Sequence, residues 1–408
     1  MKIRHLFIVF CFLYNAGSQA QSLQDYLLIA KKNSPELQSQ QYRHESALEK
    51  INEVGSVSNT TFGVGYFVQE AETRVGAQKT KLSVSQVLPW FGTLEAKKES
   101  ESFKADAQLN SIDLTKRKLF LNVKTAYFEL YELKEKEIVL NRNIDILNTY
   151  EKLALNELEN NRSTMVDILK IQIEQNEVAN NRKTVFENLN AKKRAFNLLL
   201  NRNEEVSIKV TDSILVMNKF EFFDKDLINQ NPKLLELDNL QISLLKSELA
   251  IKKEGLPKIG LGLDYVFIEN RAVDNLLDNG KDIIMPMVSV SVPLFSKKYS
   301  SKQKQLQLEQ KAIETIRAET TNQLNSVYEI ALANLKNAER AIKTQTDNLT
   351  QAEQAERVLL ASYQTSKLDF VQILEIQQLK LKFQLNRITA EKQYAIQQAV
   401  IEFLTSDN

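Results

Sequence analysis

Residues 259–267 read Ile259-Gly260-Leu261-Gly262-Leu263-Asp264-Tyr265-Val266-Phe267, with a bulky apolar side chain at every odd-numbered position. Glycine or aspartate occupies most of the positions between. A period of two is typical of a β-strand with one apolar face and one small or polar face. The same alternation recurs in three other segments, so the sequence predicts four strands, at about 57–69, 79–88, 258–268 and 283–292.

The surroundings of these strands are repeated, which indicates a tandem duplication. Pro35 corresponds to Pro232, and Phe62-Gly63-Val64-Gly65 corresponds to Ile259-Gly260-Leu261-Gly262, both at an offset of 197 residues. Farther along, Ile168-Leu169-Lys170-Ile171-Gln172 corresponds to Ile373-Leu374-Glu375-Ile376-Gln377 at an offset of 205. We therefore expect a first repeat at 21–201, a connecting segment at 202–225 and a second repeat at 226–408.

Long helices are predicted around the strands, because glycine and proline are confined to two windows. After residue 20, these two residue types fall only within 35–92 and 232–293. The remaining stretches are rich in Leu, Lys, Glu, Gln and Ala, which favour helix. Apolar residues recur there at steps of three, four and seven, the pattern of coiled-coil packing. The predicted helices are 23–54, 93–158 and 163–200 in the first repeat, and 226–254, 297–363 and 367–404 in the second. At ~1.5 Å per residue, the longest would reach roughly 90 Å, which predicts an elongated protein.

The first twenty residues are typical of a secretory signal peptide. A basic start is followed by an apolar run from Leu6 to Tyr14, and Ser18-Gln19-Ala20 supplies small residues for cleavage before Gln21. The run is about half the ~20 residues that a membrane-spanning helix needs. We therefore expect export of the remaining chain, with a membrane anchor as the alternative.

Composition argues against several classes of protein. The only cysteine, Cys11, lies in the predicted signal, so we expect no disulfide and no thiolate metal site in the exported chain. His44 would then be the only histidine, and a histidine without a partner is more often a surface or helix-packing residue than a catalytic one. The 53 basic and 52 acidic residues nearly cancel, which gives no electrostatic reason to bind nucleic acid. With no dinucleotide-binding or P-loop motif, we expect no enzyme activity, no cofactor and no metal.

The alternation in the strands also fits a membrane-spanning β-barrel with lipid outside and water inside. A half-buried hairpin of a soluble protein shows the same alternation, so that alternative stays open. Export and the lack of any other predicted strand to cover the hairpins favour the barrel. Four strands cannot close a barrel with a useful lumen, because about eight only just fill with side chains. Since open edges are not tolerated in lipid, we expect three copies to share one barrel.

The signal, the duplicated halves and the proline-containing turn after the second strand of each repeat together resemble the TolC family of outer-membrane efflux ducts. The resemblance covers about residues 22–405. Its most specific stretch is Tyr363-Gln364-Thr365-Ser366-Lys367-Leu368-Asp369-Phe370-Val371-Gln372-Ile373-Leu374-Glu375-Ile376-Gln377. The counterpart in the first repeat is Asn160-Asn161-Arg162-Ser163-Thr164-Met165-Val166-Asp167-Ile168-Leu169. The family often has glycine at these turns, where this chain has Asn161 and Ser366.

The resemblance implies a mainly α fold with a transmembrane β part. Long coiled-coil helices would form a helical barrel, and four strands per protomer would contribute to a shared 12-stranded barrel in a homotrimer. The implied location is the outer membrane of a Gram-negative bacterium, in contact with lipid and extending into the periplasm. The segment 202–225 would belong to an equatorial belt around the tube.

The implied function is a passive exit duct of a tripartite efflux or type I secretion system, gated at its periplasmic helical tip. A periplasmic adaptor protein and an inner-membrane transporter would be its partners. The alternative is an exported periplasmic coiled-coil adaptor or scaffold protein. That alternative accounts for the helices but leaves the strands and the tandem repeat unexplained.

The resemblance also implies two groups of residues at the tip. Rings of acidic residues on the last helix line the constriction in the family, and here Glu375 matches one ring while Gln372 departs from the other. A solvated helix face is the alternative for Glu375. The implied constriction residues are Glu375, Gln372, Asp369 and Asp167. The residues implied in closing the turns or contacting the adaptor are Tyr363, Ser366, Lys367, Asn161, Arg162 and Ser163.

Overall fold

The structure, a computed structural model, describes residues 22–160, 162–210, 224–272, 275–294, 297–364 and 370–405. The predicted signal peptide lies outside these residues, as do four of the implied tip residues: Asn161, Ser366, Lys367 and Asp369. The described residues belong to two compact units. The tip unit comprises 22–34, 119–210 and 333–399, and the sheet unit comprises 35–118, 224–332 and 400–405.

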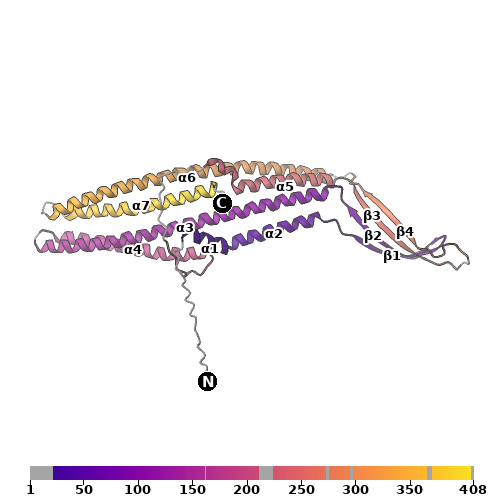
Figure 1. Ribbon diagram of the computed structural model, residues 1–408, viewed down its shortest axis with the longest axis horizontal. Coiled ribbons are helices and arrows are strands. Elements are labelled where there is room, and N and C mark those ends of the chain that lie inside the picture. Colours follow the sequence, from indigo (N-terminus) through magenta and orange to yellow (C-terminus); the bar gives the residue numbers. More distant parts are fainter. Residues whose placement is uncertain are drawn as a thin grey trace, which may run out of the picture. The chain divides into compact units, whose positions relative to one another are not determined.

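Each repeat contains the same succession of elements (Figure 1). The first has α1 (Leu23–Asn33), α2 (Pro35–Gly55), β1 (Thr61–Thr73), β2 (Gly76–Leu88), α3 (Thr93–Glu159) and α4 (Met165–Leu199). The second has the 3-10 helix η1 (Lys225–Gln230), α5 (Pro232–Glu254), β3 (Lys258–Glu269), β4 (Ile283–Ser291), α6 (Lys298–Gln364) and α7 (Phe370–Thr405). Helices α3 and α6 both have 67 residues, and their first and last residues each lie 205 positions apart.

The helix predicted at 23–54 is two helices, and the prediction of one was wrong because Pro35 interrupts it. A proline disfavours helical backbone in the residue before it, and Ser34 accordingly has a ψ of 114°. The second repeat has the same break, where Asn231 precedes Pro232 with a ψ of 131°. The Asn231 side chain accepts a hydrogen bond from the Lys233 N–H at 3.0 Å and caps α5, which therefore begins at Pro232 and not at 226.

The first hairpin is displaced from its predicted bounds. Strand β1 begins at Thr61 and not at 57, because the Ser58 and Thr60 side chains form hydrogen bonds with β2 ahead of the regular ladder. At the other end Thr73 pairs with Gly76 across a tight turn, so β1 and β2 both continue up to that turn. Strands β3 and β4 lie within about one residue of the predicted ranges.

The four strands form one antiparallel sheet in the order β1-β2-β3-β4. Their registers place apolar residues in common rows: Val64 pairs with Leu82, Leu82 with Tyr265, and Tyr265 with Ile284. One face therefore carries apolar side chains from all four strands. The members of this apolar face include Phe62, Val64, Tyr66, Leu82, Val84, Leu261, Leu263, Tyr265, Phe267, Ile284, Val288 and Val290.

The apolar face is the more exposed of the two faces. Phe62, Val64 and Val288 are 79%, 77% and 73% exposed. On the opposite face, which we call the small face because glycine and serine predominate there, Asp264 is fully buried and forms an ion pair with Lys81. A sheet packed on a water-soluble core would show the reverse distribution.

Helices of the sheet unit lie in the order α2-α3-α5-α6 (Figure 1). The Nδ1 atom of His44 on α2 lies 3.0 Å from the Ala105 carbonyl oxygen of α3, which fits the helix-packing role expected for this histidine. The buried hydroxyls of Ser100 on α3 and Ser243 on α5 are 3.2 Å apart. Farther along, Arg317 on α6 pairs with a carboxylate on α5.

Helices of the tip unit lie in the order α4-α3-α7-α6. Lys192 on α4 forms an ion pair with Glu129 on α3, with a nitrogen–oxygen distance of 2.6 Å. Glu132 on α3 pairs with Lys392 on α7 at 2.9 Å. Burial alone would raise the pKa of Glu132, but hydrogen bonds from lysine and threonine side chains hold that pKa below its ordinary value. The α3–α7 contact is therefore favoured by an ionised carboxylate.

Replacing Gly76 by alanine is expected to destabilise the sheet. Gly76 has a φ of 141°, and an added Cβ would overlap the Glu269 carbonyl oxygen of β3. Such strain costs about 1–3 kcal/mol, which should lower the midpoint of thermal unfolding measured by circular dichroism. The matched control is Gly65→Ala, because the nearest atom to its added Cβ would be 3.9 Å away. Equal midpoints for the two variants would contradict this account of the turn.

Candidate functional site

The turn between α3 and α4 is held by a helix cap. The Thr164 hydroxyl accepts a hydrogen bond from the Asp167 N–H at 3.3 Å, and the Asp167 carboxylate accepts one from the Thr164 N–H at 2.9 Å. Together these bonds make a capping box that starts α4. Ser163 donates a further hydrogen bond to the same carboxylate at 3.3 Å. Asp167 is therefore engaged in local structure, although its residue type suits a pore-lining acid.

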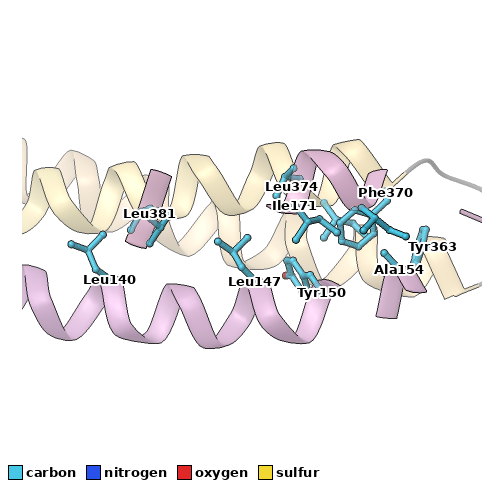
Figure 2. Packing of buried hydrophobic residues seen from close by; sticks show 12 residues of the cluster. Leu140, Leu147, Tyr150, Ala154, Ile171, Tyr363, Phe370, Leu374 and Leu381 are labelled. Carbon is cyan, nitrogen blue, oxygen red and sulfur yellow. The ribbon is translucent and has the colours of Figure 1, made fainter. Parts of the chain in front are cut away.

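Beside this turn lies a buried hydrophobic cluster, shown in Figure 2. Its centre is aromatic: the Phe370 ring packs against Tyr363 and Tyr150, with centroid distances of 5.5 and 5.7 Å. All four long helices contribute to it, so the α3–α4 pair and the α6–α7 pair share one core. The members are Leu140, Leu147, Tyr150, Ala154, Ile168, Ile171, Val178, Tyr363, Phe370, Ile373, Leu374 and Leu381.

Tyr363 lies where the resemblance implied a closing contact. Its pKa is raised chiefly by burial, with an opposing effect from the nearby Ser163 and a smaller contribution from the negative charge of Asp167. Tyr363 therefore lies near Ser163 and Asp167, but its buried hydroxyl has no hydrogen-bond partner among the described residues. Arg162 is more peripheral: its backbone N–H donates to the Glu157 carbonyl at 2.8 Å, and its guanidinium is mostly exposed.

A buried polar network lies next to the aromatic cluster, and sequence reasoning missed it. The Tyr150 hydroxyl of α3 donates to the Glu356 carboxylate of α6 at 2.7 Å, and Lys380 of α7 forms an ion pair with the same carboxylate. The Lys380 and Glu356 side chains are only 10% and 14% exposed. Burial and the carboxylate raise the pKa of Tyr150, so its hydroxyl stays protonated and donates. The network ties three helices together.

This network has a weaker counterpart in the first repeat, which could have revealed it. Glu151 lies 205 positions before Glu356, and Gln175 lies 205 positions before Lys380. Gln175 donates to Glu151 at 2.9 Å. The repeat therefore preserves the contact while replacing the ammonium group by an amide. The two repeats were aligned on their proline, glycine and apolar residues. Comparing their polar residues at the 205-residue offset as well would have identified the Glu356–Lys380 pair.

The implied constriction residues on α7 are exposed. Gln372 and Glu375 lie one turn apart on the solvent-accessible side of the helix. Lys170 on α4 occupies the position equivalent to Glu375, at the same offset of 205, and is exposed as well. Sequence reasoning did not consider Lys170. Its placement means that the two repeats present opposite charges at one level of the tip unit.

Neither metal binding nor a helical membrane span is indicated in the part of the chain that the structure describes. Among those residues, no group of three or more His, Cys, Asp or Glu side chains is arranged to hold a metal ion. The described helices are also too polar, or too short in their apolar stretches, to cross a bilayer.

Solved outer-membrane proteins have a similar fold. The outer membrane protein VceC from Vibrio cholerae matches with a TM-score of 0.74 and 14% identity, over 94% of this chain and 96% of its own. The outer-membrane channel OprN gives a TM-score of 0.76 and 12% identity, over 95% and 90% of the two chains. The Campylobacter jejuni CmeC outer membrane channel gives 0.72 and 14%, over 94% and 85%.

No protein-family model matches the sequence, and no curated protein does. The structural likeness covers nearly the whole chain and includes both the helical and the sheet parts. The predicted fold class, mainly α with four strands in a TolC-like arrangement, is therefore confirmed.

Replacing Lys380 by methionine is expected to destabilise the tip unit by about 3 kcal/mol, because the buried Glu356 carboxylate loses its cation. Faster amide hydrogen exchange in α6 and α7 around these residues would report the loss. The matched control is Gln175→Met, which removes an uncharged donor from Glu151 and should cost about 1 kcal/mol or less. Similar exchange in both variants would show that the ion pair contributes little.

Proposed function

We propose that the chain is one protomer of a trimeric outer-membrane channel, a passive duct for solutes. The observation that carries the proposal is the exposed apolar face of the sheet. A contiguous apolar surface of this kind is unfavourable in water and favourable against lipid tails. The small face, with glycine, serine and the Lys81–Asp264 pair, would then line a water-filled lumen.

The edges of the sheet support the trimer. Strands β1 and β4 are its outer strands, so each has a row of backbone groups without a partner strand in the part of the chain that the structure describes. Such groups cannot stay unpaired in lipid. Pairing β4 of one copy with β1 of the next satisfies both edges, and three copies give a closed barrel of ~12 strands, wide enough for a lumen.

The location and the assembly follow from the same reasoning. VceC and CmeC, to which the fold is similar, are an outer membrane protein and an outer membrane channel. A barrel in the outer membrane would leave the long helices in the periplasm. The alternative of an exported coiled-coil adaptor or scaffold accounts for the helices but gives no role to an exposed apolar face on four strands. A duct of this kind performs no chemistry.

Solubility and assembly of the purified full-length chain test the proposal. We expect it to require detergent and to migrate on a denaturing gel as a trimer without heating and as a monomer after boiling. Reconstitution into planar bilayers should give discrete conductance steps. A monomer that stays soluble without detergent, and gives no conductance, would overturn the proposal.

The tip unit would form the periplasmic entrance, as part of a tripartite efflux or type I secretion system with an adaptor and an inner-membrane transporter. Ser163 and Asp167 hold the α3–α4 turn beside the buried Tyr363 of α6, so loosening that turn would let the α3–α4 pair move against the α6–α7 pair. Asp369, Ser366, Lys367 and Asn161 belong to the same proposal but lie outside the described residues. Exposed polar contacts are worth about 1 kcal/mol or less each, so closure would need several of them.

Charge at the constriction is a prediction of its own. If Glu375 and Lys170 face the lumen at one level, a trimer has three of each there. Because the opposite charges cancel, the entrance should select only weakly between cations and anions. Glu375→Lys should shift the preference toward anions and Lys170→Glu toward cations. Each shift should be about twofold to fivefold, since a unit charge a few ångströms away is worth on the order of 1 kcal/mol in water.

Reversal potentials in a salt gradient across a planar bilayer measure this preference. The double variant Glu375→Lys/Lys170→Glu exchanges the two charges and is the matched control, because it should restore the original potential. If neither single substitution changes the reversal potential, these residues do not line the constriction.

A further inference from the structure

The end of α5 and the starts of α3 and α6 meet where the helices join the sheet (Figure 1). An ion pair between Lys97 and Glu254 connects α3 to α5. A Cβ added at Gly255 would lie 3.4 Å from the Tyr299 ring, so the turn after α5 packs against the start of α6. We call this region the junction; it comprises residues 88–99, 252–258, 292–294 and 297–304.

The junction has an excess of lysine, most of it in the second repeat. Residues 297–304 contain four lysines and no acidic residue, whereas the equivalent residues 92–99 contain two lysines and two glutamates. Residues 252–258 add three lysines and one glutamate. At the opposite end of the sheet, residues 269–282 contain four acidic residues and two basic ones. Positive charge is therefore concentrated at the end of the sheet that adjoins the helices.

Helix stability does not account for the lysines at the start of α6. The amino end of a helix has a partial positive charge, so it favours acidic residues and disfavours lysine. Helix α6 nevertheless has no acidic residue in its first turn, and Lys297, Lys298 and Lys302 lie at that end. Lys253 differs, because it lies in the last turn of α5, where a cation is favourable. An external anion would offset the unfavourable charge at the start of α6.

Lys253 lies against the turn that follows β2. In that turn the Thr93 N–H donates to the Trp90 carbonyl at 3.0 Å, and Gly92 has a φ of 74°. A Cβ added at Gly92 would overlap the Lys253 ammonium group, so glycine lets the lysine approach the turn. Among the residues that the structure describes, no carboxylate forms an ion pair with Lys253 or Lys297. Both ammonium groups are thus available to an anion.

The junction also contains side chains that are typical of a membrane–water boundary. The Trp90 and Phe91 rings meet edge to face, with a centroid distance of 6.1 Å, and Phe91 is 79% exposed. Leu294 is 70% exposed, so exposed apolar surface continues beyond the strands up to the lysines. The Lys298 Nζ lies 5.7 Å from the centre of the Tyr299 ring. Tryptophan and tyrosine prefer the headgroup level of a bilayer, where lysine can keep its ammonium group in water.

From these observations we propose that the junction binds the headgroups of anionic phospholipids in the leaflet that adjoins the helices. Lys253, Lys297 and Lys298 contact the lipid phosphates, and Trp90 lies at the level of the headgroups. The net positive charge selects an anionic lipid over a zwitterionic one, because each lysine near an anionic surface strengthens binding about fivefold. This inference rests on the proposed function, which places the sheet in the membrane.

Quenching of tryptophan fluorescence tests the inference, because Trp90 is the only tryptophan in the chain. The full-length chain is reconstituted in phosphatidylcholine bilayers that contain a small fraction of brominated phosphatidylglycerol. A parallel sample contains the same fraction of brominated phosphatidylcholine. Bromine on the acyl chains quenches only a nearby tryptophan. We expect the brominated anionic lipid to quench more strongly, with an association constant at least about fivefold higher.

Substitution of the three lysines should remove this preference. We expect Lys253→Gln/Lys297→Gln/Lys298→Gln to be quenched about equally by the two brominated lipids. The variant Lys253→Arg/Lys297→Arg/Lys298→Arg keeps the charges and should keep the preference. Both variants should still migrate as a heat-sensitive trimer, which shows that they fold.

A matched control removes three exposed lysines that lie outside the junction: Lys170→Gln/Lys183→Gln/Lys281→Gln. It changes the net charge by the same amount and should retain the preference. Inorganic phosphate distinguishes a lipid site from a site for free phosphate. At equal ionic strength, phosphate and chloride buffers should give the same quenching, because the lipid headgroup is held at the junction by the membrane as well as by its charge.

The outcomes separate this inference from the proposed function. Equal quenching of the unmodified chain by the two lipids, in a preparation that forms a heat-sensitive trimer and conducts, would overturn the lipid site and leave the channel intact. Loss of the preference in the control variant, or its loss in phosphate but not in chloride, would overturn the site as well. If the chain forms neither a trimer nor a conducting channel, the proposed function fails together with this inference.

Discussion

Backbone hydrogen bonding at the sheet edges is the constraint on which the rest of this structure depends. Two rows of apolar residues cross all four strands, so lipid can cover this face from β1 to β4; they are Val64–Leu82–Tyr265–Ile284 and Phe62–Val84–Leu263–Pro286. Among the described strands, β1 and β4 each have a partner on one side only, and lipid cannot satisfy the backbone groups of the other side. In the proposed barrel, neighbouring copies supply those partners. The fully buried Asp264, paired with Lys81 on the small face, fits a wall whose polar side faces a lumen.

Two kinds of interaction hold the tip unit, and they differ in how easily they can change. The aromatic cluster around Phe370 and the Tyr150–Glu356–Lys380 network are buried, so separating the helices there would expose apolar surface and an uncompensated charge. The capping contacts of the α3–α4 turn, among Ser163, Thr164 and Asp167, are more accessible and individually weak. In the proposed opening, movement would thus be concentrated at that turn, with the deeper core serving as the fixed part.

Most of the fold could be predicted because regular patterns of residue types in the sequence indicate its helices and strands. The alternation in 259–267 specifies both faces of the sheet, and the absence of glycine and proline specifies the long helices. The break at Ser34 was predictable from Pro35 but was outweighed by the helical composition around it. Buried polar networks are different, because Tyr150, Glu356 and Lys380 are 24 to 230 residues apart and share no local signal. Asp167 shows a further limit, since a capping carboxylate and a pore-lining carboxylate have the same residue type.

The pairing of β2 with β3 has a consequence for how the chain acquires its structure. Leu88 and Ile259, at one end of that pairing, are 171 residues apart, so the central strand pair brings together segments from the two halves. Pairing between strands so far apart in the sequence is slow, because the chain loses the entropy of closing the long loop before the strand contacts contribute any free energy. Until that pairing forms, the edge of β2 that faces β3 has no partner strand, and an unpaired strand edge is an aggregation hazard. Chaperones that hold unfolded chains would therefore determine the yield of this protein.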